Sequence, residues 1–103
     1  MQGHLVQILL PLYDNAHHPL PAHLHEEVKA SLTLEFGGVT AYVHAPAEGR
    51  WKDGTRETRD EMVMYEVVTD TLDAAWWGRY RKVLTTRFQQ KEIMMRALPM
   101  QRL

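Results

Sequence analysis

The chain of 103 residues is long enough for one domain with its own core and too short for two. Its 12 Lys and Arg residues nearly balance its 13 Asp and Glu residues, which argues against a dedicated nucleic-acid-binding protein, because such proteins normally carry a basic excess. The absence of cysteine excludes disulfides, thiolate metal ligands and cysteine catalysis.

The first residues, MQGHLVQILLPLYD, lack the basic region and the small-residue cleavage site of a signal peptide, and Gln7 and Pro11 interrupt their apolar run. No stretch approaches the ~18 apolar residues that a helix needs to span a bilayer. We therefore expect a cytoplasmic protein without membrane contacts.

Six elements are predicted in chain order. An apolar run predicts a buried strand over 5–12, followed by a loop rich in turn-forming residues. Apolar residues at every fourth position predict an amphipathic helix over 22–36, ended by Gly37-Gly38. Alternating residues predict strands over 39–44 and 61–68. A second helix is expected over about 72–88, and a last strand over 92–98 that stops at Pro99.

The second helix has several candidate N-cap oxygens, on Thr69, Asp70 and Thr71. Its core stripe is expected to consist of Leu72, Trp76, Tyr80, Val83/Leu84 and Phe88. Trp77 is then about 100° away around the helix from Trp76. Its basic residues are interpreted as a solvated face: Arg79, Arg81, Lys82 and Arg87.

The order β-α-β-β-α-β predicts a ferredoxin-like α+β fold for one domain spanning residues 1–103. Its four-stranded antiparallel sheet has the order 4-1-3-2, and right-handed crossovers place both helices on one face. The other face has no cover within a chain of this length. We expect that face to carry Leu5, Gln7, Leu9, Thr40, Tyr42, His44, Met62, Met64, Glu66, Met94 and Arg96.

This second set of residues is too apolar for a surface that faces water. Because two-fold dimers are the commonest assembly of such chains, we expect a homodimer that packs sheet against sheet, as in a dimeric α+β barrel.

Two segments, FGGVTAYVHAPAEGRWKDGTRETRDEMVMYEV and TLDAAWWGRYRKVLTTRFQQKEIMM, resemble a family of small bacterial proteins known only as a domain of unknown function. The resemblance spans about residues 5–95 and is carried by Phe36-Gly37-Gly38-Val39-Thr40, Gly49-x-Trp51, the Arg/Glu pair before the third strand, and Phe88-Gln89-Gln90-x-x-Ile93. Some members of that family carry an export or lipoprotein leader; we expect this chain to be of the cytosolic type.

More distantly, the layout is similar to the dimeric α+β barrels, which include antibiotic-biosynthesis-type monooxygenases and stress-response proteins. This similarity implies a fold and transfers no catalytic residue.

The expected sheet order places Gln7, Glu66 and Arg96 on adjacent strands, all pointing away from the helices. Tyr42 and His44 follow on the strand beyond. One interpretation is that Glu66 and Arg96 pair across a dimer seam and fix its register. The alternative is a small-molecule site with an apolar floor, in which His44 transfers protons and Arg96 holds an anion.

The histidine-rich segment HHPLPAHLH is suggestive of a metal site, but His23 and His25 are two residues apart and do not share a helix face. No zinc motif is satisfied, so we expect solvated histidines, no metal and no cofactor.

The segment GRWKDGTRETRDE is interpreted as a hairpin connection, because Asp53-Gly54 is a strong turn signal. Trp51 is expected to fold back onto the sheet edge or onto the partner chain; alternatively, it anchors another protein. The sequence contains no phosphate-binding loop or nucleophile motif and names no reaction or catalytic residue.

Overall fold

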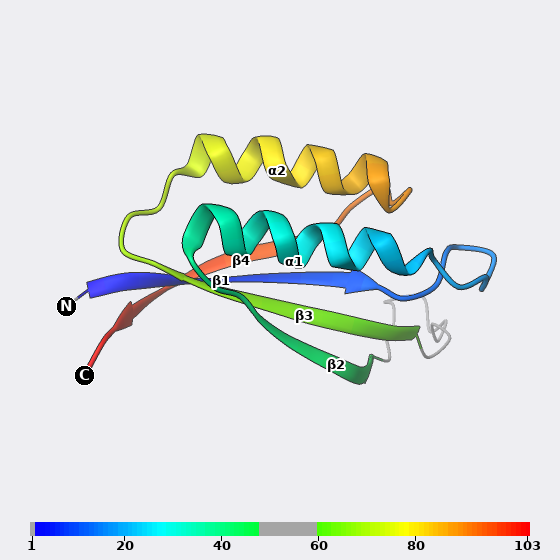
Figure 1. Ribbon diagram of the computed structural model, residues 1–103, viewed down its shortest axis with the longest axis horizontal. Coiled ribbons are helices and arrows are strands. Elements are labelled where there is room, and N and C mark those ends of the chain that lie inside the picture. Colours follow the sequence, from blue (N-terminus) through cyan, green and yellow to red (C-terminus); the bar gives the residue numbers. More distant parts are fainter. Residues whose placement is uncertain (1, 48–59) are drawn as a thin grey trace, which may run out of the picture.

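The computed structural model describes residues 2–47 and 60–103. In chain order the elements are β1 Gln2–Pro11, α1 Ala22–Phe36, β2 Thr40–Ala47, β3 Asp60–Thr69, α2 Ala74–Arg87 and β4 Met94–Gln101. The strands pair antiparallel in the order β2-β3-β1-β4, which is the predicted order seen from the other edge. Both helices cover one face of the sheet, and no described helix covers the opposite face (Figure 1). The predicted ferredoxin-like α+β fold is confirmed.

The core lies between the helices and the covered face of the sheet. Alternate residues of the two central strands are buried there, and the helices add two short stripes. The sheet contributes Val6, Ile8, Leu10, Val63, Tyr65 and Val67; α1 contributes Val28 and Leu32; α2 and the turn after it contribute Trp77, Tyr80, Leu84 and Phe88. Each such aliphatic or aromatic side chain stabilises the fold by roughly 1.5–3 kcal/mol relative to exposure.

The first turn of α2 differs from the prediction. Its N-cap is Asp73, whose carboxylate accepts a hydrogen bond from the backbone N–H of Trp76 at 3.1 Å. Trp77 is the buried tryptophan and Trp76 is only partly buried. Phe36 at the end of α1 contacts both tryptophans, because its ring stacks on Trp77 at 4.8 Å between centroids and meets Trp76 edge-on at 5.0 Å.

Two strand ends also differ from the prediction. β4 runs through Pro99, which was expected to stop it. Because β4 is an edge strand with β1 as its neighbour, it can hold a proline that donates no hydrogen bond to the sheet. At the other edge, β2 continues past His44, with a register shift between Val43 and Ala45. Val43 was expected under the helices and is 48% exposed, since it lies on this outer edge.

No helix within residues 2–47 and 60–103 is long and apolar enough to cross a membrane.

Gly37 ends α1 in a left-handed conformation with φ +83°, and its N–H donates to the carbonyl of Thr33 at 2.8 Å. This backbone costs an L-residue roughly 1–2 kcal/mol. We therefore expect Gly37→Ala to lower the free energy of unfolding by about 1 kcal/mol in urea denaturation. Gly38→Ala is the matched control, since Gly38 has no positive φ and an added Cβ would meet nothing within 4 Å. Equal losses in the two variants would contradict this account.

Candidate functional site

A row of polar side chains crosses the open face of the sheet. Gln7 stands in register with Glu66 on β3 and with Arg96 on β4. The Gln7 Nε2 donates to Glu66 Oε2 at 2.7 Å, and the Arg96 Nε donates to Gln7 Oε1 at 2.6 Å. The central amide is therefore hydrogen-bonded at both ends and orients the carboxylate and the guanidinium on either side of it. The structure thus brings together three of the residues singled out from the sequence.

The row continues onto β2. Thr40 is the register partner of Glu66, and Tyr42 is the register partner of Met64. The Tyr42 hydroxyl donates to the Glu66 carboxylate, and this contact raises the pKa of Tyr42 because ionisation would place two negative charges side by side. We call Tyr42, Glu66, Gln7 and Arg96 the polar row.

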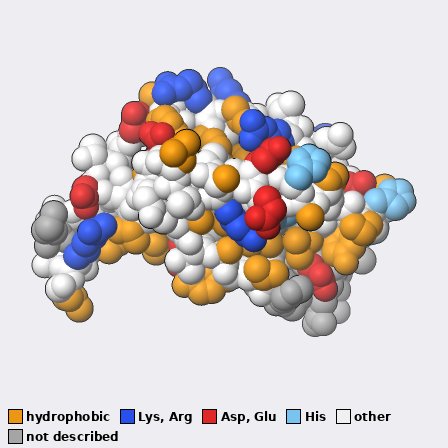
Figure 2. All heavy atoms as spheres, in the orientation of Figure 1, with side chains coloured by type: hydrophobic (Ala, Val, Ile, Leu, Met, Phe, Trp, Pro, Cys, Tyr) orange, Lys and Arg blue, Asp and Glu red, His pale blue; other side chains and the backbone are white. Residues whose placement is uncertain are grey.

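Apolar side chains flank the polar row on both sides. Leu5 stands in register with Val68 and Leu98 on one side, and Leu9 with Met64 and Met94 on the other. Val68, Met94 and Leu98 are each 39% exposed. Figure 2 shows hydrophobic side chains along the lower margin of the molecule, where the sheet in Figure 1 has no helix over it. The open face is therefore a polar row between two apolar rows.

The other two predicted site residues are not placed by the structure. The backbone of His44 lies in β2 at the register shift, but its side chain is not described. Trp51, with the hairpin function assigned to it, lies outside the described residues.

The structure places one histidine where the sequence analysis did not. His25 was grouped with the solvated histidines, but it is 8% exposed and packs between α1 and the sheet. Its Nε2 lies 2.9 Å from the carbonyl oxygen of Pro11, and its Nδ1 lies 2.6 Å from the hydroxyl of Tyr65. A carbonyl only accepts, so Nε2 donates to it, and Nδ1 of the neutral ring accepts the Tyr65 hydroxyl proton. The surface assignment of His25 is wrong.

A signal for this burial exists in the sequence. His25 precedes Val28 by three residues and Leu32 by seven, which is the spacing of one buried helical stripe. The composition of the segment, with its four histidines, obscured that spacing.

Burial sets the protonation of the pair. Burial of the imidazole away from water lowers the pKa of His25, and the charge of nearby Lys29 also lowers it. The Pro11 carbonyl and Glu26 raise the pKa, but the net shift is downward. Burial also raises the pKa of Tyr65. His25 and Tyr65 therefore form a neutral, hydrogen-bonded pair.

The start of the histidine-rich segment, His17 and His18, lies in a tight turn around Asp14. The Asp14 carboxylate accepts from the backbone N–H groups of Ala16 and His18 at 2.9 and 2.8 Å. No group of three or more His, Asp or Glu side chains in the described part of the chain is placed to hold a metal ion.

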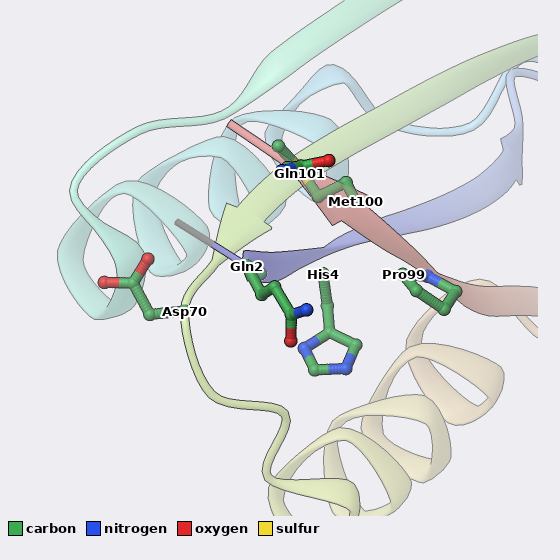
Figure 3. A pocket seen from close by; sticks show the side chains of 7 residues that line it. Gln2, His4, Asp70, Pro99, Met100 and Gln101 are labelled. Atoms are coloured by element: carbon green, nitrogen blue, oxygen red, sulfur yellow. The ribbon is translucent and has the colours of Figure 1, made fainter. Parts of the chain in front are cut away.

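A hollow of about 490 Å³ lies where the start of β1 meets the end of β4. Figure 3 shows Gln2 and His4 projecting from β1 on the same side, with Asp70 apart from them. Nδ1 of His4 is buried and has no hydrogen-bond partner in the described part of the chain, whereas Asp70 lies 3.6 Å from the guanidinium of Arg102. Asp70 is the only carboxylate among the lining residues, so the hollow offers no acid paired with His4.

No protein-family model and no curated protein matches the chain. Among solved structures, the chain is similar to a phage SAM lyase in complex with S-methyl-5'-thioadenosine, with 11% sequence identity and a TM-score of 0.60. The similarity covers 93% of this chain and 80% of the lyase chain. At this identity it shows a shared ferredoxin-like fold and nothing of the site.

Acidification is expected to destabilise the protein through His25. Its pKa in the folded state lies below the ordinary value of 6.5, so the unfolded chain binds the proton first as the pH falls, and the free energy of unfolding decreases below about pH 6.5. The measurement is urea denaturation at about pH 7.5 and about pH 5.

His25→Gln removes the titrating ring and keeps an amide that hydrogen-bonds, so this variant should start less stable and lose less on acidification. His23→Gln, at an exposed position of the same helix, is the control and should follow the wild type. If His25→Gln and the wild type lose the same stability, His25 is not the group responsible.

Proposed function

We propose that the protein functions as a homodimer in which the open sheet faces of two copies pack against each other, forming a dimeric α+β barrel. The observation that carries this proposal is the polar row held between two apolar rows. A two-fold axis brings a surface against itself, so the surface must complement its own pattern. A polar row between two apolar rows meets this requirement, because the apolar rows of one copy then lie against the apolar rows of the other.

The charges of the row also complement each other. Arg96 lies on β4 and Glu66 lies two strands away on β3. When two rows run in opposite directions, the guanidinium of one copy meets the carboxylate of the other. The Nε of Arg96 donates to Gln7, and its two terminal nitrogens have no partner among the described residues, which leaves them available for a forked contact with a carboxylate.

The apolar rows supply the driving force for association. Leu5, Leu9, Met64 and their neighbours cover the face of a sheet that has no helix on it, and patches of this kind on soluble domains usually mark an interface. The similarity of the layout to the dimeric α+β barrels supports the same assembly.

Met64→Glu tests the dimer directly. Met64 lies in the middle of an apolar row, next to Tyr42 and Leu9, so a carboxylate there would be buried without a partner in the dimer. We expect a wild-type dimer by light scattering at a concentration on the order of 10 µM and a folded monomer for Met64→Glu.

Leu34→Glu is the matched control, because Leu34 is 89% exposed on α1, away from the sheet. It should remain dimeric. A monomeric wild type, or a dimeric Met64→Glu, would overturn the proposal.

A second candidate function is the binding of a small molecule at the same row. It is favoured by the exposed ring of Tyr42 beside methionines and by the terminal nitrogens of Arg96, which together offer an aromatic face, an adaptable apolar floor and a donor. The similar phage lyase is described in complex with S-methyl-5'-thioadenosine, so this nucleoside thioether is a suitable first probe.

The probe should raise the thermal midpoint of the wild type, and Tyr42→Ala should weaken its binding roughly tenfold, as expected for the loss of one stacking contact with a base. Tyr13→Ala removes an exposed tyrosine elsewhere and serves as the control. Equal affinity in Tyr42→Ala and the wild type would exclude the row as the binding site of this compound.

A further inference from the structure

A second concave surface lies on the helix-covered side of the sheet, at the start of α1. It is a pocket of about 390 Å³, within the range of small-molecule sites. Its walls come from the loop after β1, the first two turns of α1, and the facing parts of β2 and β3. The apolar lining includes Leu12, Tyr13, Leu20, Val43 and Val63.

The loop that forms one wall is fixed by its own hydrogen bonds. The backbone N–H of Leu12 donates to the carbonyl of Glu61 at 3.1 Å, and that of Leu20 donates to the carbonyl of Leu12 at 2.9 Å. Tyr13 and Pro19 pair across the loop in an isolated bridge. A wall held in this way needs no ordering when a ligand enters, which favours binding.

The floor of the pocket is the His25–Tyr65 pair. The hydrogen bonds to Pro11 and between the two side chains occupy both ring nitrogens of His25 and the proton of Tyr65. Phe88 meets the imidazole edge-on at 5.1 Å between centroids, which fixes the ring. The floor therefore offers no free hydrogen-bonding group. His25 is only 8% and Tyr65 0% exposed, so the apolar side chains around the pair form most of the contact surface for a ring or a compact apolar group.

The rim carries charge. Lys29 pairs with Glu26 at 3.2 Å, so these two side chains neutralise each other. Glu61, on the opposite side at the start of β3, has no ion-pair partner among the described residues. Among the described residues, the rim thus holds one carboxylate without an ion-pair partner beside an apolar cavity, and this charge attracts a cation and repels an anion.

We propose that this pocket binds a small molecule with an apolar ring and a protonated amino group, the ring against the apolar lining around the His25–Tyr65 pair and the amine at Glu61. The site is separate from the polar row, because Tyr65 and Glu66 are neighbours in β3 and therefore point to opposite faces of the sheet.

The probe is 2-phenylethylamine, titrated into the full ¹⁵N-labelled protein and followed by amide chemical shifts. A ligand of this size should bind with a dissociation constant of about 1 mM. The shifts should saturate at Leu20, Val43 and Val63 and be absent at Gln7 and Arg96. The neutral analogue 2-phenylethanol should bind roughly threefold more weakly, since an exposed ion pair contributes modestly, and the anion 3-phenylpropanoate more weakly again.

Two variants complete the test. Glu61→Gln should bind the amine and the alcohol equally, whereas Glu35→Gln, at the far end of α1, should keep the preference for the amine. Ala22→Trp places a large ring at the mouth of the pocket from an exposed position and should abolish the shifts. Absence of saturable shifts with the amine, unchanged binding in Ala22→Trp, or equal affinity of amine and alcohol for the wild type would each overturn the proposal.

Discussion

The register of β1 against its two neighbours is the constraint on which the rest of the structure depends. Val6 pairs with Val67, Gln7 with Glu66 and Ile8 with Tyr65, and so on along the strand. Because side chains alternate between faces, a slip of one residue would turn the buried residues of β1 towards water and bring Gln7 into the core. The apolar core and the polar row are two results of the same pairing.

Because one face of the sheet is buried, only this register is favourable. The same register also fixes the positions of the side chains on the open face. In water, hydrogen bonds from an amide such as Gln7 to two exposed partners contribute little to stability, because they replace hydrogen bonds to water. Here the core already fixes the backbone, so Glu66 and Arg96 are held at hydrogen-bonding distance from Gln7 with little additional loss of freedom. The stability of the core therefore preorganises the surface proposed for the dimer.

A second constraint is the attachment of α1 to the sheet. His25 connects the helix to Tyr65 on β3 and to Pro11 at the end of β1 through two hydrogen bonds within an otherwise apolar interface. A buried polar group of this kind destabilises the fold when it is unpaired, and its hydrogen bonds form only in one geometry. It therefore favours one position of the helix over other positions with a similar apolar contact area. The pocket beside it exists because α1 is held at this position.

The sequence predicted the parts of the molecule that follow from local periodicity. The alternation of β1, β3 and β4, with the strand order implied by β-α-β-β-α-β, was enough to place Gln7, Glu66 and Arg96 side by side. The predictions that were wrong concern residues whose burial or strand position depends on contacts with other elements of the fold. Trp77 is buried instead of Trp76 only once α2 is packed in the fold, and Pro99 does not end its strand because β4 lies at the edge of the sheet.

The same reasoning explains why the polar row could be predicted from the sequence and the pocket could not. The polar row lies on one face of paired strands, where a period of two residues identifies every member. The pocket combines a loop, a helix and two strands, and its floor depends on a histidine whose burial only the packed helix reveals. Strand β3 serves both sites, with Tyr65 under the pocket and Glu66 in the row. Because Tyr65 and Glu66 are adjacent in β3 and point to opposite faces, a substitution at one of them is coupled to the other through the shared backbone.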